Sequence, residues 1–459
     1  MNRDTQIGFS LLFLSILLAS APGVRAQEPL TLGKAVELAL HQNPSLQSAK
    51  DDADAARARV KEIRAGWLPR FDFSQGFTRG NNPVYVFGTL LTQRSFTAAN
   101  FTLSNLNTPA PLDNFQTRLD GQISLFDSFR TRFRMEGAKE QLSMADSQTE
   151  QSRQDLILQV VHDYYGVIVA RENLLAADDA LRTAESNERR TEHMQTAGLI
   201  VDSDVLSAKV FLAQMKDRKI RTQNDLESAQ TVLAREMGMT IDAHPEPSEA
   251  LSEPNSIPTN AQQEWIQTAL EHRPILQMAQ LREEAARSEG REARAELGPT
   301  VGLYANLERD ALTLGGPSGT NWTAGARIDF NLYSGGAQTA RRAESQASQS
   351  KAKHDLEWVR SGVLVEVRHS YLEASAAAQR AATARDAVEQ ARESLRIIQN
   401  RYEAGLTNVT ETLRAQTAHL EAHTGYLAAL HDWQVARAKL EHSAGVLTPD
   451  SALLQGRAQ

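Results

Sequence analysis

Two histidines near the end of the chain have a spacing that could bind a metal ion. His419 and His423 lie four residues apart, so on a helix both side chains share one face. A zinc site needs three or four nitrogen, sulfur or carboxylate ligands. The chain has no cysteine, and the residues a turn away on that face add no ligand: Ala415, Gln416, Tyr426 and Leu427. We therefore expect surface or packing histidines and no metal.

Paired carboxylates could act as a general acid and base. Asp51-Asp52 and Asp178-Asp179 are such pairs, but consecutive side chains on a helix point away from each other, so these pairs are expected on solvated faces. The sequence contains no serine with a supporting histidine and aspartate, no phosphate-binding glycine loop and no cofactor fingerprint. We expect neither an enzyme nor a cofactor.

Composition limits the remaining classes of protein. The formal net charge is −8 and the basic residues are scattered, so a nucleic-acid partner is not expected. Only 6% of the residues are aromatic, and long stretches are rich in Ala, Gln, Arg and Glu, which is typical of long packed helices. After the N-terminal region no apolar run approaches the ~20 residues of a membrane-spanning helix, which excludes a helical membrane protein.

The N-terminus has the pattern of a secretory signal. Arg3 precedes an apolar run from Ile7 to Leu18, and small residues follow up to Ala26. The run is short for an uncleaved anchor. Without cysteine, no lipid can be attached at the cleavage site. We expect cleavage before Gln27 and a mature chain outside the cytoplasm.

The mature chain repeats one series of landmarks. Residues 35–50 align with residues 265–280 around Pro44 and Pro274. Further landmarks recur in the same order: Pro69 as Pro299, His162 as His369, Ala197-Gly198-Leu199 as Ala404-Gly405-Leu406, and Gly238 as Gly445. A repeat of this length indicates two copies of one structural unit. We expect a signal peptide over 1–26, a first repeat over 27–239, a Pro-rich linker over 240–260, a second repeat over 261–447 and a disordered tail over 448–459.

Each repeat contains two segments in which apolar and polar residues alternate. The four segments span residues 70–77, 117–125, 301–308 and 322–332. Such strands occur in outer-membrane barrels and also in soluble sheets packed on one side. No amphipathic helix is left over to cover the apolar faces, which favours the barrel. Four strands cannot close a barrel, and an open edge cannot exist in lipid, so several subunits are required. The long connection from Arg79 to Asn114 is expected on the extracellular side.

Helices account for the rest of each repeat. The first, over 31–67 or 261–297, is broken at its proline. After the strands, residues 129–197 and 336–404 lack proline and would form helices roughly 100 Å long. Each reverses at a glycine into a returning helix, over 204–237 or 411–444. In the second copy a seam near heptad spacing requires partner helices: Leu364, Val367, Tyr371, Ala374, Ala378, Ala381, Ala384, Val388, Ala391, Leu395, Ile398 and Tyr402.

The ordered motifs resemble those of the TolC-like outer membrane efflux proteins. The resemblance covers nearly the whole mature chain and rests on these residues: Leu30-Thr31-Leu32, Leu38-Ala39-Leu40, Asn43-Pro44, Leu68-Pro69, Leu125-Phe126-Asp127, Ala197-Gly198-Leu199, Asp204-Val205-Leu206 and Arg401 to Leu406. It implies a mainly α fold with a β-barrel part. It also implies a homotrimer in outer-membrane lipid, whose twelve strands form one barrel continued by a twelve-helix periplasmic tunnel.

The resemblance also implies functional positions. The turns at Gly198-Leu199 and Gly405-Leu406 would be the tips where a periplasmic adaptor docks and links the duct to an inner-membrane pump. By motif position, candidates for a gate near the tips are Asp204, Tyr402 and Glu411. Arg414 stands where some members carry a second acidic residue of the constriction, so cation selectivity is not carried over.

We therefore expect a passive outer-membrane exit duct of a tripartite efflux pump or type I secretion system. The alternative is a soluble periplasmic coiled-coil adaptor or scaffold, which would explain the signal and the long helices but not the four strands. Drugs, metals, siderophores and polypeptides would all pass through such a duct, so the sequence does not select a cargo.

Overall fold

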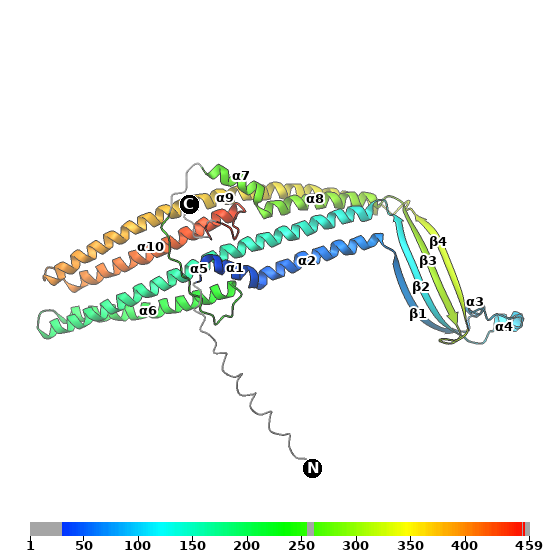
Figure 1. The fold of residues 1–459 in the computed structure, drawn as a ribbon, viewed down its shortest axis with the longest axis horizontal. Helices are drawn as coiled ribbons and strands as arrows, with labels where there is room; N and C mark the ends of the chain where they lie inside the picture. Colours follow the sequence, from blue (N-terminus) through cyan, green and yellow to red (C-terminus); the bar gives the residue numbers. More distant parts are fainter. Residues whose placement is uncertain (1–29, 255–260, 452, 455–459) are drawn as a thin grey trace, which may run out of the picture.

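The computed structural model describes residues 30–254, 261–451 and 453–454. The predicted signal peptide and residues 255–260 of the predicted linker lie outside this range. The molecule is elongated, with a small sheet at one end and two helical hairpins reaching to the other (Figure 1). Among the described residues, none of the helices is apolar enough over a sufficient length to cross a lipid bilayer.

The two halves of the chain follow the same order of elements. The first half contains α1 (Leu32–Gln42), α2 (Pro44–Arg64), a short 3-10 helix η1 (Ala65–Trp67), β1 (Arg70–Gly80), β2 (Leu112–Phe126), α5 (Arg130–Thr196) and α6 (Asp202–Glu236). The second contains α7 (Gln262–His272), α8 (Pro274–Ala295), β3 (Thr300–Ala311), β4 (Ser318–Asp329), α9 (Ala337–Glu403) and α10 (Val409–Ser443). The prediction of a mainly α fold made of two copies of a strand pair and a long helical hairpin is confirmed.

The four strands form one antiparallel sheet in the order β1-β2-β3-β4. Its register places apolar side chains in a row on one face: Phe73, Leu119, Leu307 and Trp322. All four are exposed, Phe73 by 70% and Trp322 by 76%. The next row, on the other face, is polar: Ser74, Arg118, Glu308 and Asn321. The alternation read from the sequence is therefore a real division into an apolar and a polar face.

Several strand boundaries differ from those expected, most clearly the start of β2 and the end of β4. β2 begins at Leu112 rather than Thr117, because its ladder with β1 continues through the polar residue Asn114 to Gly80. β4 ends at Asp329 rather than Leu332, because its partner Thr300 is the first residue of β3 and directly follows Pro299. In both places the pairing partner, and not the local pattern, sets the end of the strand.

The connection between β1 and β2 is not an irregular loop. It contains α3 (Pro83–Thr92), a 3-10 helix η2 (Ala98–Phe101) and α4 (Leu103–Asn107). Asn82 begins α3 by accepting hydrogen bonds from the backbone N–H groups of Val84 and Tyr85, and Pro83 occupies the first helical position. The equivalent connection between β3 and β4 is the short segment 312–317.

The long helices α5 and α9 have 67 residues each, and the returning helices α6 and α10 have 35 each. α6 packs along α5, and α10 packs along α9. The predicted seam of α9 is only partly covered within one chain. Val367, Tyr371, Ala374 and Ala381 are buried, whereas the seam residues from Ala384 to Tyr402 are half-exposed. Toward the tip, part of this seam is therefore not covered by another helix of the same chain.

The main core lies midway along the molecule, where α1, α5 and α6 meet. Its largest buried side chains include Tyr164, Leu32 and Ile157. The described part of the predicted linker packs here: Glu249 Oε1 accepts a hydrogen bond from Leu32 N at 2.9 Å, and the Pro247 carbonyl accepts one from Arg171 Nη1 at 2.7 Å. The segment thus contributes to the core besides connecting the repeats.

The expectation of a disordered tail from residue 448 is wrong for its described part. Leu453 and Leu454 are each 5% exposed and belong to the same core as Leu32 and Ala35 of α1. The two leucines bury apolar surface together with the side chains of α1 in this core. Removing such surface from water is favourable, and this holds the segment in place.

The junction of each broken helix contacts the end of a returning helix. The Asn43 side chain accepts a hydrogen bond from Ser45 N at the start of α2 and donates one to the Glu236 carbonyl of α6 at 2.9 Å. In the second repeat the buried Arg273 donates to the His442 carbonyl of α10 and pairs with Glu366 at 2.8 Å. One residue before each proline therefore closes a helix end in its own repeat.

Two glycines allow these closures. Gly238 and Gly445 follow α6 and α10 with φ of +70° and +75°. A Cβ at Gly238 would lie 2.6 Å from the backbone of Gln42, and one at Gly445 would lie 2.7 Å from that of His272. Only glycine combines the positive φ with such a close approach of two backbones.

We predict that Gly238→Ala destabilises the protein by about 2 to 4 kcal/mol, because a left-handed alanine and a clash with backbone add together. The measurement is the thermal midpoint of the detergent-solubilised protein. Gly425→Ala is the matched control: Gly425 lies within α10 with open space around it, and alanine is the better helix former there. Equal midpoints for the two variants would contradict the close contact at Gly238.

Candidate functional site

The hairpin ends farthest from the sheet are two glycine turns (Figure 1). Gly198 and Gly405 have φ of +72° and +70°, and the following leucines, Leu199 and Leu406, are 71% and 70% exposed. In each turn the leucine N–H returns to a carbonyl of the preceding helix, at 2.9 Å for Leu199 to Met194 and 2.8 Å for Leu406 to Arg401. These bonds satisfy helix-end carbonyls and leave the leucine side chains on the outside.

The two turns differ in how the next helix begins. Asn408 accepts a hydrogen bond from Glu411 N at 3.0 Å and so caps α10. Val201 stands at the same place before α6 and provides no side-chain cap. Because an uncapped helix start is less stable than a capped one, typically by about 1 kcal/mol, the α6 tip is the weaker of the two.

Three contacts link the hairpins near their tips. Arg190 of α5 pairs with Glu403 of α9 at 3.5 Å, and both side chains are more than half exposed. The Tyr402 hydroxyl lies 3.7 Å from Met194 Sδ. The third contact, farther from the turns, is a 3.2 Å hydrogen bond from Asn187 Nδ2 to Gln416 Oε1.

An apolar cluster lies under these contacts. It joins α5, α6 and α10 through six buried side chains: Ala184, Phe211, Met215, Val409, Leu413 and Leu420. Tyr402 packs against its edge. The polar links between the hairpins therefore rest on a continuous apolar contact.

The predicted gate residues fall into two groups. Tyr402 belongs to the first: burial raises the pKa of its phenol, Arg190 acts to lower it and Asp204 acts to raise it, so both charges lie within electrostatic reach of the hydroxyl. Glu411 and Arg414 form a separate pair within α10, with Nη1 of Arg414 2.9 Å from Oε1 of Glu411. Arg190, Met194 and Glu403 belong to the first group and were not among the predicted residues. Contacts between two hairpins leave no local pattern in the sequence.

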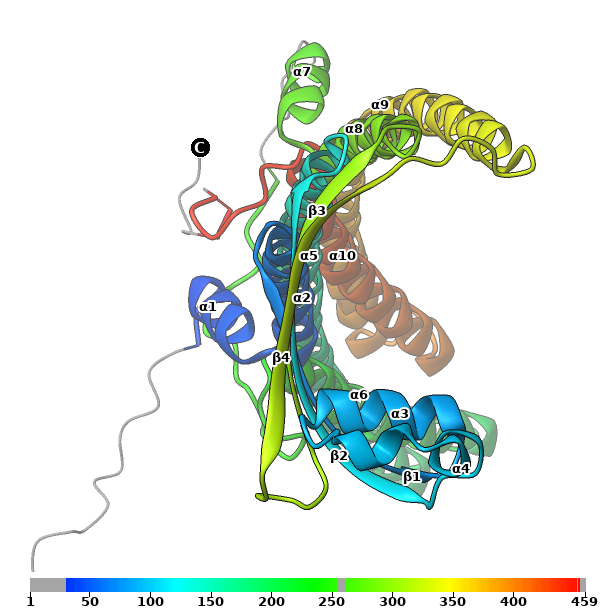
Figure 2. The same cartoon turned by 90° about the vertical axis from the view of Figure 1, so that its right-hand side faces the viewer.

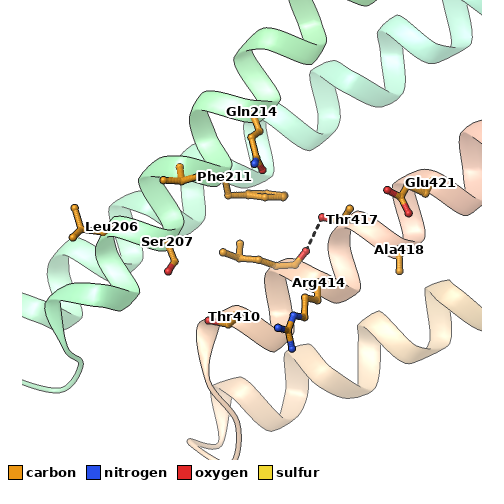
Figure 3. A pocket seen from close by; sticks show the side chains of 11 residues that line it. Leu206, Ser207, Phe211, Gln214, Thr410, Arg414, Thr417, Ala418 and Glu421 are labelled. Carbon is orange, nitrogen blue, oxygen red and sulfur yellow. Dashed lines mark hydrogen bonds between the residues drawn. The ribbon is translucent and has the colours of Figure 1, made fainter.

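A groove with a volume of about 530 Å³ separates α6 from α10 behind the tips. Figure 3 shows its two sides, with Leu206, Ser207 and Phe211 on α6 and Thr410, Arg414 and Thr417 on α10. Leu206 and Val210 of α6 are 63% and 59% exposed although both are apolar. Their spacing of one helical turn is the signal by which sequence reasoning could have found this surface.

The two histidines at metal-binding spacing line a different hollow, between α5, α9 and α10. Burial lowers the pKa of His419, and the neighbouring His423 acts in the same direction. Glu172 and Asp179 also line this hollow. Across the described ranges, however, no three His, Cys, Asp or Glu side chains come close enough together to hold a metal ion.

Comparisons with known proteins agree with this architecture. The family described as "Outer membrane efflux protein" matches residues 35–239 and 265–446. Among curated proteins, the chain is 23% identical to the proteases secretion protein PrtF of Dickeya chrysanthemi, over 95% of this chain and 92% of the relative. It is also 23% identical to the outer membrane protein TolC of Escherichia coli, over 90% of this chain and 81% of the relative.

Solved structures share the fold. The CmeC outer membrane channel of Campylobacter jejuni superposes with a TM-score of 0.77 at 16% identity, covering 93% of this chain and 88% of that one. The open state of the MtrE channel of Neisseria gonorrhoeae gives a TM-score of 0.73 at 18% identity, with coverage of 91% and 90%. In both, the likeness extends over the sheet and the hairpins together.

Proposed function

The chain belongs to the outer membrane efflux protein family, and we propose that three copies form one exit duct that works with a periplasmic adaptor and an inner-membrane pump. As a member of this family of channels, it forms an exit duct of the outer membrane, with its helical tunnel in the periplasm. The alternative of a soluble periplasmic scaffold falls with the family assignment.

The proposal of a trimer is based on the open edges of the structure: the sheet and the helical layer each end in two edges that have no partner within the chain. β1 and β4 are the outer strands of the four-stranded sheet. α2 leads into β1 and α9 leaves β4, so the helical layer ends on the same two sides as the sheet. A second copy that pairs its β1 with this β4 therefore also brings its α2 beside this α9.

The exposed face of α9 supports the same neighbour. Trp358, Val365 and Leu372 recur at heptad spacing and are 79%, 69% and 55% exposed. Such a stripe needs a partner helix. The half-exposed lower seam of α9 has the same need, and a second copy would supply the missing helices.

The tips fit a docking and gating role. Leu199 and Leu406 present apolar side chains at the periplasmic end, where the adaptor would bind. In the resting state the contacts of Tyr402 with Met194 and of Arg190 with Glu403 would hold the hairpins together. An adaptor that binds the separated arrangement better would shift the duct toward the open state.

The cargo belongs to the classes handled by efflux or secretion systems. PrtF and the alkaline protease secretion protein AprF of Pseudomonas aeruginosa carry protease secretion in their names. A secreted polypeptide is therefore the first cargo class to test for this chain.

We predict that the mature chain, extracted from outer membranes in mild detergent, gives elongated particles with threefold end views in negative stain.

A glutamate at Trp358, Val365 or Leu372 should lower the temperature at which the trimer dissociates, because each apolar side chain contributes about 1.5 to 3 kcal/mol when fully buried.

Lys353→Glu is the control for these variants, since Lys353 is exposed on α9 away from the stripe. Compact or soluble particles would reject the trimeric duct. A stripe variant as stable as Lys353→Glu would reject this face as the contact between subunits.

We predict that charge reversal at Asp204 and Glu411 together raises the resting conductance of the reconstituted duct several-fold. At position 411 the new positive charge would repel Arg414, and at position 204 it would replace an acidic neighbour of Tyr402 by a basic one. Single-channel recording in planar bilayers is the measurement. The control is Asp217→Arg on the exposed face of α6, where the aspartate pairs with Arg221 of its own helix. An unchanged conductance in the double variant would remove these residues from the gate.

A further inference from the structure

The connection between β1 and β2 has a structure that the duct described above does not use. It lies at the end of the sheet opposite the helical hairpins (Figure 1). Viewed along the molecule, α3 and α4 lie on the concave side of the curved chain (Figure 2). In a trimeric duct the concave side faces the lumen, so the connection would sit over the extracellular mouth.

Its backbone is docked on the polar face of the sheet. Gly319 pairs with Asp310 on the polar face of the sheet, and a Cβ at Gly319 would collide with the carbonyl of Thr92 at the end of α3. The same carbonyl accepts a hydrogen bond from Asn321 Nδ2 at 3.1 Å. Arg94 donates to the Thr320 carbonyl at 2.6 Å. The end of α3 therefore rests on β4 itself.

A chain of buried amides fastens this docking. Gln93 is 6% exposed, and its Nε2 donates to the Asp113 carbonyl at 2.8 Å and to Asn114 Oδ1 at 2.9 Å. Asn114 Nδ2 then donates to Asp310 Oδ1 at 2.7 Å. We call Gln93, Asn114 and Asp310 the latch. Because each member is buried and each bond depends on the next, loss of one member weakens the others.

The latch also has an energetic cost, the desolvation of Asp310, and this cost favours its release. Asp310 is 1% exposed, and its Oδ2 is buried with no hydrogen-bond partner among the described residues. Its other oxygen, Oδ1, accepts hydrogen bonds from two neutral amides, those of Asn114 and Gln116. A buried carboxylate without a cation pays a large desolvation penalty. Undocking would return this carboxylate to water, which offsets part of the lost hydrogen bonding.

The rest of the connection is a compact apolar body. Phe87, Phe96 and Phe101 pack edge to face, with ring centroids 5.0 Å apart for Phe87 and Phe96 and 5.3 Å apart for Phe96 and Phe101. Val84 and Leu103 are 82% and 75% exposed on its outside. Apolar side chains above a water-filled lumen need a cover, and around a threefold axis the surface within reach is the same segment of the other two copies.

We propose that residues 81–111 form a lid over the extracellular mouth, held to the lumen wall by the latch and closed over the axis by contact with the lids of the other two copies. This inference rests on the proposed trimeric duct. It gives the exit end of the duct its own gate, separate from the one at the periplasmic tips. The equivalent connection of the second repeat, residues 312–317, is short, so residues 81–111 would cover that side of the mouth as well.

The test measures access to the lumen from outside intact cells. The chain has no cysteine, so Ser74→Cys places a single thiol on the polar face of β1, and a bulky, membrane-impermeant maleimide reports its exposure. We expect slow labelling in the otherwise unchanged chain. Gln93→Ala should speed the labelling about tenfold, as expected from the loss of two buried hydrogen bonds.

Further variants fix the direction of the effect. Asp310→Asn keeps an acceptor for Asn114 but removes the buried charge, so it should slow the labelling. In the trimer, Leu103→Asp would place three negative charges close together at the axis, and their repulsion should speed the labelling. Ser95→Ala is the matched control, because the Ser95 hydroxyl bonds only to Leu90 within the same connection.

Leu314→Cys, in the exposed turn between β3 and β4, separates the two possible failures. If Leu314→Cys is not labelled in intact cells, the chain is not presented as an outer-membrane duct and the proposed function fails. If it is labelled while Ser74→Cys reacts fast from the start, or reacts equally in the Gln93→Ala and Ser95→Ala backgrounds, the duct stands and the lid is rejected.

Discussion

An unpaired strand edge cannot be left in lipid, and most of this architecture follows from that constraint. Each unpaired backbone group in the hydrocarbon region costs several kcal/mol. One chain supplies only four strands, and its outer strands β1 and β4 leave both edges open. Because α2 and α9 continue from those strands, the closure of the sheet and that of the helical layer become one event. The exposed stripe of α9 is then what the proposed trimer requires, since a second copy would cover it.

The two repeats make the same junction between helices, but with different side chains. In each repeat a helix broken at a proline must contact the end of the returning helix, and a left-handed glycine makes room for it. The first repeat uses the neutral Asn43 for this contact, whereas the second uses the buried Arg273. Beside Arg273, burial acts to raise the pKa of Asp155, but the hydrogen bond from His442 and the charges nearby leave it lowered. The two junctions therefore differ in charge and in hydrogen bonding, although they occupy matching places in the two repeats.

Features that depend on a few neighbouring residues could be predicted from the sequence. Prolines, glycine turns and alternation gave the helix breaks, the hairpin reversals and the four strands, because each depends on a few neighbouring residues. Packing between distant segments was not predictable in this way. The packing of Leu453 and Leu454 has no local signal, because their partners on α1 lie hundreds of residues earlier in the chain. The same holds for Arg190 and Met194 beside Tyr402, which meet only because two separate hairpins lie side by side.

The strength of the tip contacts bears on how such a duct can open. The pair Arg190–Glu403 is more than half exposed on both sides, and exposed pairs contribute only about 0 to 1 kcal/mol. The apolar cluster around Phe211 and Val409 therefore supplies most of the contact between the hairpins, while the polar links set their register. Moving a two-state equilibrium from one per cent to ninety-nine per cent open needs about 5.5 kcal/mol of differential binding. Shared among the three subunits of the proposed duct, this would be about 2 kcal/mol for each pair of tips. A few leucine-sized contacts provide that much, so a passive duct with weak polar links can respond to a partner that itself supplies no chemical energy at the tips.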